Sequence, residues 1–409
     1  MRQQRVYPSV QITAKAERLV KQGHPWIYGA ELKSRQEPPE NGGLIDVFAG
    51  SAYMGTGFYN DHSKITVRLL SRNANDRFDE AFWRRRVEYA VAYRKTVMPG
   101  PDFSCCRLIH GEADQMPGLT VDRYGDLLVA QVLSLGMERI QDQVFCALCD
   151  VLAGLGEPVR GIYLRNDVAI RELEGMEQGK GWYPLPGQPL PEETVTEIVE
   201  NGVRYQVDVE NGQKTGFFLD QKYNRQAVGR IAQNKYVLDC FTHTGSFGLN
   251  AALGGAAQVT CVDISNSAIE MARENAVRNG VEKRMVFQQA DVFRLLTELA
   301  ESRRRAYDLI ILDPPAFTKS RSTVRDAVRG YKEINLKAMK LLPRGGYLAT
   351  CSCSHFMSDT LFCQMLKSAA RDAAVSLRQI EARQQAPDHP VLWNVPETEY
   401  LKFYLFQVV

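Results

Sequence analysis

The C-terminal half of the chain repeats one pattern: a short apolar run, a polar turn, and then a segment whose apolar positions recur at helical spacing. The runs are rich in Val, Ile and Leu, as expected of strands buried on both faces of a parallel sheet. They cover residues 236–239, 258–262, 285–289, 307–312 and 347–350. Alternation of such strands with helices predicts an α/β fold with a Rossmann-like, doubly wound sheet.

The first of these strands ends at Asp239, and the turn after it contains Gly245 and Gly248. Glycine lets the backbone approach a small molecule closely, and open parallel sheets bind ligands at the carboxyl ends of strands where the strand order reverses. Many such turns carry glycine for packing alone. The evidence for a ligand site therefore depends on the acidic residues that follow the next strands. Asp263 stands where such folds bind ribose hydroxyls, and Asp291 is placed to reach an adenine amine.

Two further strand ends carry candidate chemistry. The fourth strand is followed at once by Asp313-Pro-Pro-Ala-Phe317, in which two prolines fix φ and remove two N–H donors. The loop is therefore stiff, and Asp313 is well placed for hydrogen bonds to a planar base. The fifth strand runs into Cys351-Ser-Cys353-Ser.

The first part of the chain reads differently. Short strands with glycine punctuation predict a small β-barrel over 1–74, and 75–182 reads as an α+β middle domain. A proline-rich linker over 183–193 precedes a hairpin, centred on Asn201-Gly202, that opens the 194–409 domain. In the barrel, Lys15, Arg18 and Trp26 combine cations with an aromatic ring, although a solvated helix face plus a core tryptophan would give the same pattern.

Composition narrows the picture without pointing to a partner. The 409 residues are 44% hydrophobic and 24% charged, with a net charge of +2, so any nucleic-acid affinity must come from local basic patches. Nine scattered cysteines and the lack of a signal peptide or a long apolar run favour a reducing cytoplasm and no membrane span. Cys146 and Cys149 have a redox or metal spacing, but they fit a helix core better, and we expect no metal site.

The fingerprint of Asp239 with Gly245, Asp263, Asp291, Asp313-Pro-Pro and Ser-Cys353-Ser resembles the class I S-adenosylmethionine-dependent methyltransferases. It is most similar to the bacterial ribosomal RNA large-subunit cytosine-5 methyltransferases that carry an N-terminal PUA domain. Matching segments occur along nearly the whole chain: Gly23–Ile27, Pro117–Arg123, Lys214–Gln221 and Asp388–Val391. Ala316 and His355 depart from residues found in some relatives, and Ala316 leaves open how the loop meets the RNA backbone.

The resemblance implies S-adenosylmethionine as cofactor, large-subunit (23S) ribosomal RNA as partner, no metal, and a possible homodimer. It assigns Cys353 as nucleophile, with Asp313 assisting. By the same resemblance, the cofactor-binding residues are Phe218, Asp220, Arg225, Asp239, Phe241, Thr244, Gly245, Asp263, Ile264, Asp291, Val292 and Asp313. The implied RNA-binding residues are Pro314, Pro315, Phe317, Lys15, Arg18 and Trp26. For Arg225, an ordinary ion pair on its helix is the competing interpretation.

Cytosine carbon 5 is a poor nucleophile, so its methylation needs a thiolate that adds to carbon 6 and raises the electron density of the ring. Cys353 suits that role and Cys351 is the weaker candidate. Three other classes of function stay open: a guanine-N7 or exocyclic-amine methyltransferase, which needs no thiol; a nicotinamide oxidoreductase; and a non-catalytic RNA-binding assembly factor. The general base that removes the carbon 5 proton is not evident.

Overall fold

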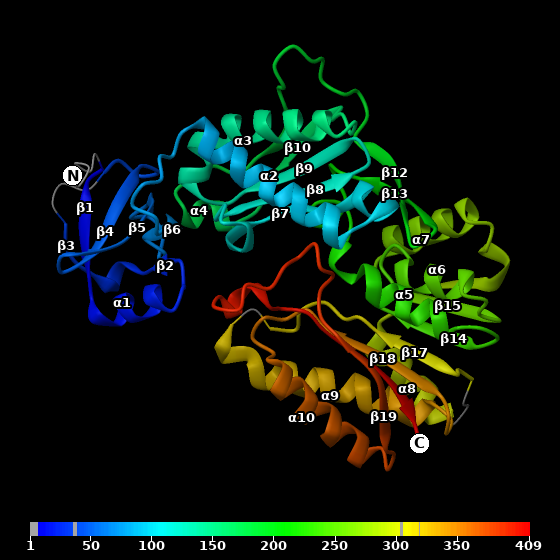
Figure 1. The fold of residues 1–409 in the computed structure, drawn as a ribbon. Coiled ribbons are helices and arrows are strands. Elements are labelled where there is room, and N and C mark those ends of the chain that lie inside the picture. Colours follow the sequence, from blue (N-terminus) through cyan, green and yellow to red (C-terminus); the bar gives the residue numbers. More distant parts are fainter. Residues whose placement is uncertain (1–6, 36–38, 303–305, 319) are drawn as a thin grey trace. The chain divides into compact units, whose positions relative to one another are not determined.

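The computed structural model describes residues 7–35, 39–302, 306–318 and 320–409, and within them the chain forms two compact units (Figure 1). The first unit takes the chain as far as Ile198 and adds Val207–Leu219 and Pro387–Thr398. The second unit consists of Val199–Gln206, Asp220–Ala386 and Glu399–Val409. Three segments of the 194–409 region, 194–198, 207–219 and 387–398, are thus grouped with the first unit.

The first unit begins with a six-stranded sheet in the order β2-β6-β5-β4-β1-β3. Its elements are β1 Ser9–Ile12, α1 Ala14–Lys21, β2 Trp26–Ile27, β3 Leu32–Arg35, β4 Leu44–Ala49, β5 Ala52–Tyr59 and β6 Val67–Ser71. β1 pairs in parallel with β4, and the remaining pairs are antiparallel. Helix α1 starts at an N-cap, where the Thr13 side chain accepts a hydrogen bond from the Ala16 N–H, and it buries Val20 in the core of this sheet.

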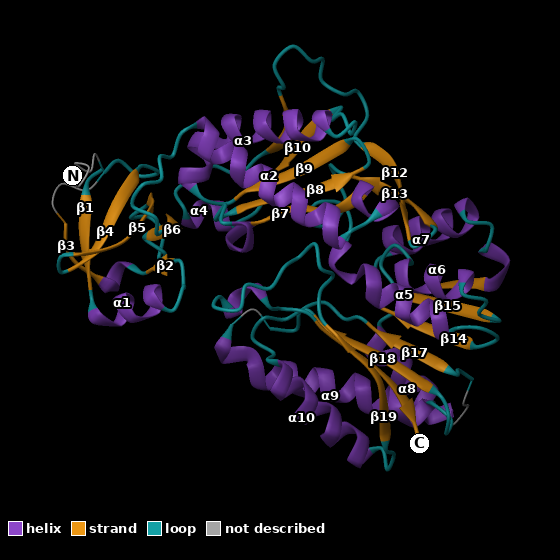
Figure 2. Ribbon diagram, viewed as in Figure 1, coloured by secondary structure: helices purple, strands orange, loops and turns teal. Residues whose placement is uncertain are grey.

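The middle of the first unit is a five-stranded sheet in the order β11-β10-β9-β8-β7, with two long helices packed together against it (Figure 2). Its elements are α2 Glu80–Val97, β7 Cys105–His110, β8 Leu119–Tyr124, β9 Leu127–Val132, α3 Leu135–Gly154, β10 Gly161–Arg165, α4 Ile170–Leu173 and β11 Lys180–Tyr183. Cys146 and Cys149 lie on α3, as predicted, and burial raises the pKa of both thiols.

A two-stranded hairpin follows, made of β12 Val195–Glu200 and β13 Val203–Asp208. Asn201 and Gly202 both have positive φ, 55° and 79°. A two-residue turn with two left-handed residues matches the right-handed twist of the strands that it joins. The Asn-Gly signal in the sequence therefore predicted this turn for the correct physical reason.

The second unit is built on a seven-stranded sheet in the order β16-β15-β14-β17-β18-β20-β19. Its strands are β14 Tyr236–Cys240, β15 Gln258–Asp263, β16 Met285–Gln289, β17 Leu309–Leu312, β18 Tyr347–Ser352, β19 Leu377–Arg383 and β20 Lys402–Val408. The first five of these run parallel, and β20 pairs antiparallel with both β18 and β19. The strand order reverses at β14, between β15 and β17. This confirms the predicted Rossmann-like sheet.

Helices form layers on the two faces of this sheet (Figure 2). They are α5 Lys222–Ile231, α6 Ser246–Leu253, α7 Asn266–Arg278, α8 Val292–Ser302, α9 Val324–Leu341 and α10 Asp359–Asp372. The face covered by α8, α9 and α10 holds a large apolar core around Leu238, Ile310 and Tyr331. In the described ranges, no helix has both the length and the apolar character needed to cross a bilayer.

Candidate active site

The turn between β14 and α6 has an unusual backbone. Three of its residues are left-handed: Phe241 at φ 62°, His243 at φ 50° and Gly245 at φ 81°. A β-carbon at Gly245 would stand 3.0 Å from the Ala272 side chain, so this position is both conformationally and sterically suited to glycine. Residues other than glycine adopt such φ values at an energetic cost, and such strain concentrates at binding sites.

Asp239 is the penultimate residue of β14, just before this turn, and is 1% exposed. Its Oδ2 accepts hydrogen bonds from Thr242 Oγ1 at 2.5 Å and from the Gly248 N–H at 2.8 Å. Its Oδ1 is buried and has no hydrogen-bond partner among the described residues. Burial raises the pKa of Asp239 to about 7, and the nearby charge of Asp313 acts in the same direction. A buried, unsatisfied carboxylate oxygen is unfavourable, so this atom marks a place for a ligand donor.

Asp220 shows the same signature. It lies in the 3₁₀ turn Leu219–Gln221, and its Oδ2 accepts a hydrogen bond from Tyr400 Oη at 2.7 Å. Its Oδ1 is a second buried carboxylate oxygen without a partner in the described part of the chain. The predicted ammonium contact of Asp220 therefore has an acceptor atom available for it.

Asp263 is the last residue of β15, and each of its carboxylate oxygens accepts a hydrogen bond from a backbone N–H group. The His243 N–H donates to Oδ2 at 2.9 Å and the Ser265 N–H donates to Oδ1 at 3.0 Å. These bonds orient the carboxylate, and each oxygen keeps a further lone pair for a hydroxyl. The next residue, Ile264, is 68% exposed, which is unusual for isoleucine and fits an apolar cover for a planar ring.

The remaining cofactor candidates are less distinctive. Asp291 caps α8 by accepting a hydrogen bond from the Arg294 N–H at 2.9 Å, and Val292 is buried in the core beneath it. Thr244 Oγ1 is buried without a partner among the described residues. Phe218 belongs to the first unit, where Lys214 Nζ lies 5.8 Å from its ring centroid, so its predicted role stays a prediction.

Arg225 has a partner that the sequence did not reveal. Its guanidinium forms a bidentate ion pair with Glu200, with Nε at 2.7 Å and Nη2 at 2.9 Å from the carboxylate oxygens, and both side chains are buried. The pair is not the ordinary helix-surface pair that was the competing interpretation, because it is buried and joins α5 to Glu200 of β12. The carboxylate role of Arg225 stays an untested prediction.

Asp313 directly follows β17, the strand beside β14. Gln221 Nε2 donates to its Oδ1 at 3.0 Å, and Asn224 Nδ2 in turn holds Gln221 Oε1 at 2.6 Å. Burial, followed by the charge of Asp220, raises the pKa of Asp313 to about 7. Gln221 is a site residue that sequence reasoning missed, although it lies inside the matching Lys214–Gln221 segment.

The residues of the loop after Asp313 differ in their exposure to solvent. Pro314 is buried and Pro315 is exposed. The ring of Phe317 packs against Tyr331, with centroids 4.5 Å apart, and against Phe293 at 5.7 Å. Phe317 thus anchors the loop to the core, which limits its availability for stacking on a base.

Cys353 lies just beyond the end of β18, the strand next to β17, and is half-buried. Cys351 is fully buried within the strand. Burial, with the charge of Asp313 next, raises the pKa of the Cys351 thiol well above its usual value. A thiol with a raised pKa supplies little thiolate, so the structure favours Cys353 over Cys351 as a nucleophile.

Known proteins resemble this chain in both sequence and fold. The family model of S-adenosylmethionine-dependent methyltransferases matches residues 179–407, and a PUA-like domain model matches residues 10–72. Proteins called ribosomal RNA large subunit methyltransferase I are similar over nearly the whole chain. The protein from Klebsiella pneumoniae is 36% identical and that from Aeromonas salmonicida 39%, covering 99% and 93% of this chain and 99% and 94% of their own.

This chain belongs to the S-adenosylmethionine-dependent methyltransferases. A solved methyltransferase structure from Streptococcus mutans superimposes with a TM-score of 0.80 at 22% identity, covering 98% of this chain and 100% of its own, and thus shares the fold. Another, complexed with SAH, also reaches 0.80, at 20% identity, and covers 99% of this chain and 100% of its own. The methyltransferase uses S-adenosylmethionine as its cofactor, and the two orphaned carboxylate oxygens fit that group.

Three of the predicted RNA-contacting residues of the methyltransferase, Lys15, Arg18 and Trp26, lie in its PUA-like region, and two of them have partners within the first unit. Trp26 Nε1 donates to Glu112 Oε1 at 2.9 Å, and the Arg68 guanidinium lies 5.9 Å from the Trp26 ring centroid. Lys15 Nζ lies 3.0 Å from Glu31. Arg18 and Lys15 are both exposed on α1.

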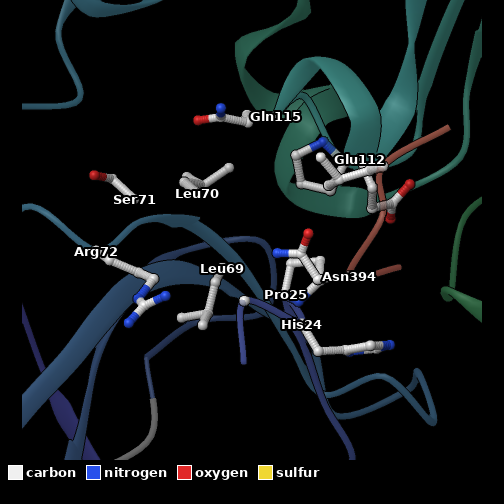
Figure 3. A pocket seen from close by; sticks show the side chains of 12 residues that line it. His24, Pro25, Leu69, Leu70, Ser71, Arg72, Glu112, Gln115 and Asn394 are labelled. Atoms are coloured by element: carbon white, nitrogen blue, oxygen red, sulfur yellow. The ribbon is translucent and has the colours of Figure 1, made fainter. Parts of the chain in front are cut away.

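The first unit also contains a cavity of about 310 Å³ (Figure 3). Its lining combines apolar walls with amide and guanidinium groups: Gly23, His24, Pro25, Leu69, Leu70, Ser71, Arg72, Glu112, Gln115, Pro117, Leu392 and Asn394. Between the last two lining residues stands Trp393, which is 94% exposed. The sequence did not single out Trp393, because a turn-rich segment has no periodic pattern that would indicate whether its tryptophan is buried or exposed.

In the described residues, no group of three or more His, Cys, Asp or Glu side chains is arranged to hold a metal ion.

Proposed function

We propose that this methyltransferase methylates carbon 5 of a cytosine in large-subunit ribosomal RNA, through a temporary bond between Cys353 and carbon 6. The observation that carries the proposal is the position of three strand ends. Asp239 lies at the carboxyl end of β14, and Asp313 and Cys353 follow β17 and β18; these three strands are neighbours and run parallel. A thiol therefore stands at the same edge of the sheet as the cofactor turn.

Ribosomal RNA is named for curated relatives of this chain, which are called ribosomal RNA large subunit methyltransferase I. The PUA-like domain match supports an RNA partner as well. The position of the base within the RNA is not part of these names, and cytosine-5 chemistry is inferred here from the placement of Cys353. The cytoplasm, where ribosomal RNA is found, is the compartment that this proposal implies, and a homodimer stays a prediction.

In the first step the Cys353 thiolate forms a bond to carbon 6, and the electron pair of the carbon 5–carbon 6 double bond moves toward carbon 5 and the ring carbonyl. S-adenosylmethionine, when bound, supplies an electrophilic methyl group. Carbon 5 takes this methyl group, a base removes the carbon 5 proton, and the carbon 6–sulfur bond breaks to return the Cys353 thiolate. Each bond that forms to Cys353 is thus also broken within one cycle.

Asp313 is suited to assist the addition step. With a pKa of about 7, its carboxyl group is partly protonated at neutral pH and can donate a hydrogen bond to cytosine N3. Such a bond draws electron density from the ring and favours attack at carbon 6. Gln221 holds the other side of this carboxyl group and fixes its orientation.

Contact with the RNA is proposed for the first unit as well. A nucleotide must leave its stack to be methylated, so the flanking RNA is expected to be single-stranded, and single strands bind to exposed aromatic rings and cations. Trp393 offers an exposed ring beside a cavity, and Arg72 lines that cavity without an ion-pair partner among the described residues. Arg18 supplies a further exposed cation on α1.

The test is Cys353→Ser in the full-length protein, with large-subunit RNA and labelled S-adenosylmethionine. We expect methyl transfer to fall by about 10³-fold or more, because serine is a far weaker nucleophile at neutral pH. RNA containing 5-fluorocytidine should give a covalent complex with the native protein, since fluorine at carbon 5 blocks the final elimination. Peptide mass spectrometry should then find the RNA attached to Cys353.

A matched control is Cys363→Ser, which changes another half-buried cysteine of the same unit, on α10. This variant should keep methyl transfer within about twofold of the native rate. Full activity in Cys353→Ser would instead favour a thiol-free reaction at guanine N7 or an exocyclic amine. Mapping of the methylated nucleotide by mass spectrometry would distinguish those products from 5-methylcytosine.

A further inference from the structure

Lys402 is a buried cation beside the proposed nucleophile. It begins β20, is 5% exposed, and pairs in the sheet with Ser352, the last residue of β18. Its Nζ donates to the backbone carbonyl of Ser354 at 2.7 Å and to that of Tyr400 at 2.8 Å. The ammonium group is therefore fixed directly against the segment that carries Cys353.

Both hydrogen-bond acceptors of this ammonium group are neutral. No carboxylate lies within ion-pair distance of Lys402 in the described part of the chain, whereas three buried arginines each have one: Arg94 has Asp114, Arg171 has Glu138, and Arg225 has Glu200. An ammonium group held away from water without a counter-ion is costly, and such groups usually find an anion or lose their proton. The missing anion of Lys402 calls for an explanation.

The charged groups that act on Lys402 come from three directions. Burial lowers its pKa to about 8, while negative charge on Cys353, then on Asp359 and Glu399, acts in the opposite direction. Asp359 is occupied by a 2.6 Å hydrogen bond from Tyr404 Oη, and Glu399 is exposed to solvent. Tyr331 also faces Cys353, and burial keeps its phenol neutral by raising its pKa. Of these three groups, Cys353 is the one whose negative charge acts most strongly on Lys402, which makes it our candidate for the anionic partner.

We propose that Lys402 stabilises Cys353 in its thiolate form, both before the attack on the base and when the sulfur leaves. The thiol proton passes to solvent, Lys402 keeps its own three protons, and no redox change occurs. This inference rests on the proposed function, in which Cys353 is the nucleophile. Lys402 does not bond to the substrate, so it is a supporting residue.

The test needs neither RNA nor cofactor. The rate of Cys353 alkylation by iodoacetamide is measured against pH in the full-length protein, with peptide mass spectrometry to report each cysteine separately. We expect a midpoint below the ordinary thiol value of about 8.5, and a midpoint about one unit higher in Lys402→Met. At pH 7 this shift corresponds to alkylation about tenfold slower in the variant.

Two control variants distinguish the effect of the Lys402 charge on Cys353 from a general effect of the substitution on the structure. Lys337→Met removes another lysine of the same unit, whose Nζ is bound by Glu333 and by Thr297 at 2.7 Å, and should leave the midpoint unchanged. Lys402→Arg keeps the charge and should keep the low midpoint. Cys146, on α3 in the first unit, serves as an internal reference for reagent and pH.

An unchanged midpoint in Lys402→Met would overturn the proposal, as would a native Cys353 midpoint at or above 8.5. The second result can be obtained even if Lys402→Met does not fold. In steady-state methylation, the pH profile of kcat should shift upward in Lys402→Met with little change in the KM for RNA. Should Cys353→Ser retain methyl transfer, the proposed function fails, but the alkylation result for Lys402 is unaffected.

Discussion

Two buried aspartates, one in each unit, differ in whether their carboxylate oxygens have hydrogen-bond partners. Asp388 in the first unit is fully satisfied, since His389 Nδ1 lies 3.0 Å from Oδ1 and the Arg107 N–H donates to Oδ2 at 2.8 Å. Burial alone would raise its pKa, but His389 and the hydrogen bonds hold the pKa below its usual value. Asp239 in the second unit has one orphaned oxygen and a pKa raised to about 7.

The same contrast extends to the neighbours of these residues. In the first unit Arg107 forms a bidentate pair with Asp122 at 2.7 and 2.8 Å. In the second unit Asp220 repeats the orphaned oxygen of Asp239, and Lys402 lacks a carboxylate within the described residues. Satisfied buried charges stabilise a fold, whereas unsatisfied ones with perturbed pKa values mark a binding or catalytic site.

The largest expected effect on stability comes from Asp388→Ala. Removing this carboxylate leaves the Arg107 N–H and the His389 ring without their buried acceptor, so we expect the free energy of unfolding to fall by about 3 kcal/mol. Urea denaturation followed by circular dichroism measures this. The exposed Glu192→Ala in the same unit is the control and should change stability by less than about 0.5 kcal/mol. Equal stability of the two variants would contradict the stabilising role that we give to the satisfied Asp388 carboxylate.

Asp263→Ala should act on binding rather than on folding. Because Asp263 stands at the expected ribose position, we expect the dissociation constant of S-adenosylmethionine to rise by about tenfold or more, as measured by calorimetry. Asp291→Ala, at the next strand end, should weaken binding less, since its carboxylate is more exposed and caps α8. An unchanged dissociation constant in Asp263→Ala would show that the map of the cofactor site is wrong.

Trp393→Ala tests the binding role given to the first unit. Stacking on an exposed aromatic ring contributes about 1–3 kcal/mol per base, so we expect the dissociation constant for single-stranded RNA to rise by about fivefold or more at fixed salt. Tyr89→Ala removes another exposed ring of this unit, on α2 and outside the cavity, and should have little effect. Filter binding with the same RNA compares the two variants directly.

The last prediction concerns pH. A carboxyl group whose pKa is raised in the folded state keeps its proton longer there than in the unfolded chain, so Asp239 and Asp313 should make the protein less stable as pH rises from about 4 to 7. Asp239→Asn should flatten this slope by at least about 1 kcal/mol between pH 5 and 8. Thermal unfolding without cofactor is the measurement, and an equally steep slope in Asp239→Asn would contradict the pKa that burial gives this group.

The sequence determined the features that depend on neighbouring residues. Apolar runs and turn residues located the strands of the second unit, because periodicity is a local property. Asn201-Gly202 predicted its turn, and the positions of Asp239, Asp263, Asp313 and Cys353 followed from counting residues past each strand. Because parallel strands bring their carboxyl ends to one edge of the sheet, strand order and spacing were enough to predict that these side chains converge.

Only the tertiary structure decided which side chains became hydrogen-bond and ion-pair partners. The pairing of Arg225 with Glu200, the support of Asp313 by Gln221, and the placement of Lys402 against Ser354 join residues that are 25, 92 and 48 positions apart. The same is true of Pro387–Thr398, which belongs to the first unit although the sequence places it inside the second. Which buried charge finds a counter-ion depends on contacts between distant segments, and residue spacing carries no information about such contacts.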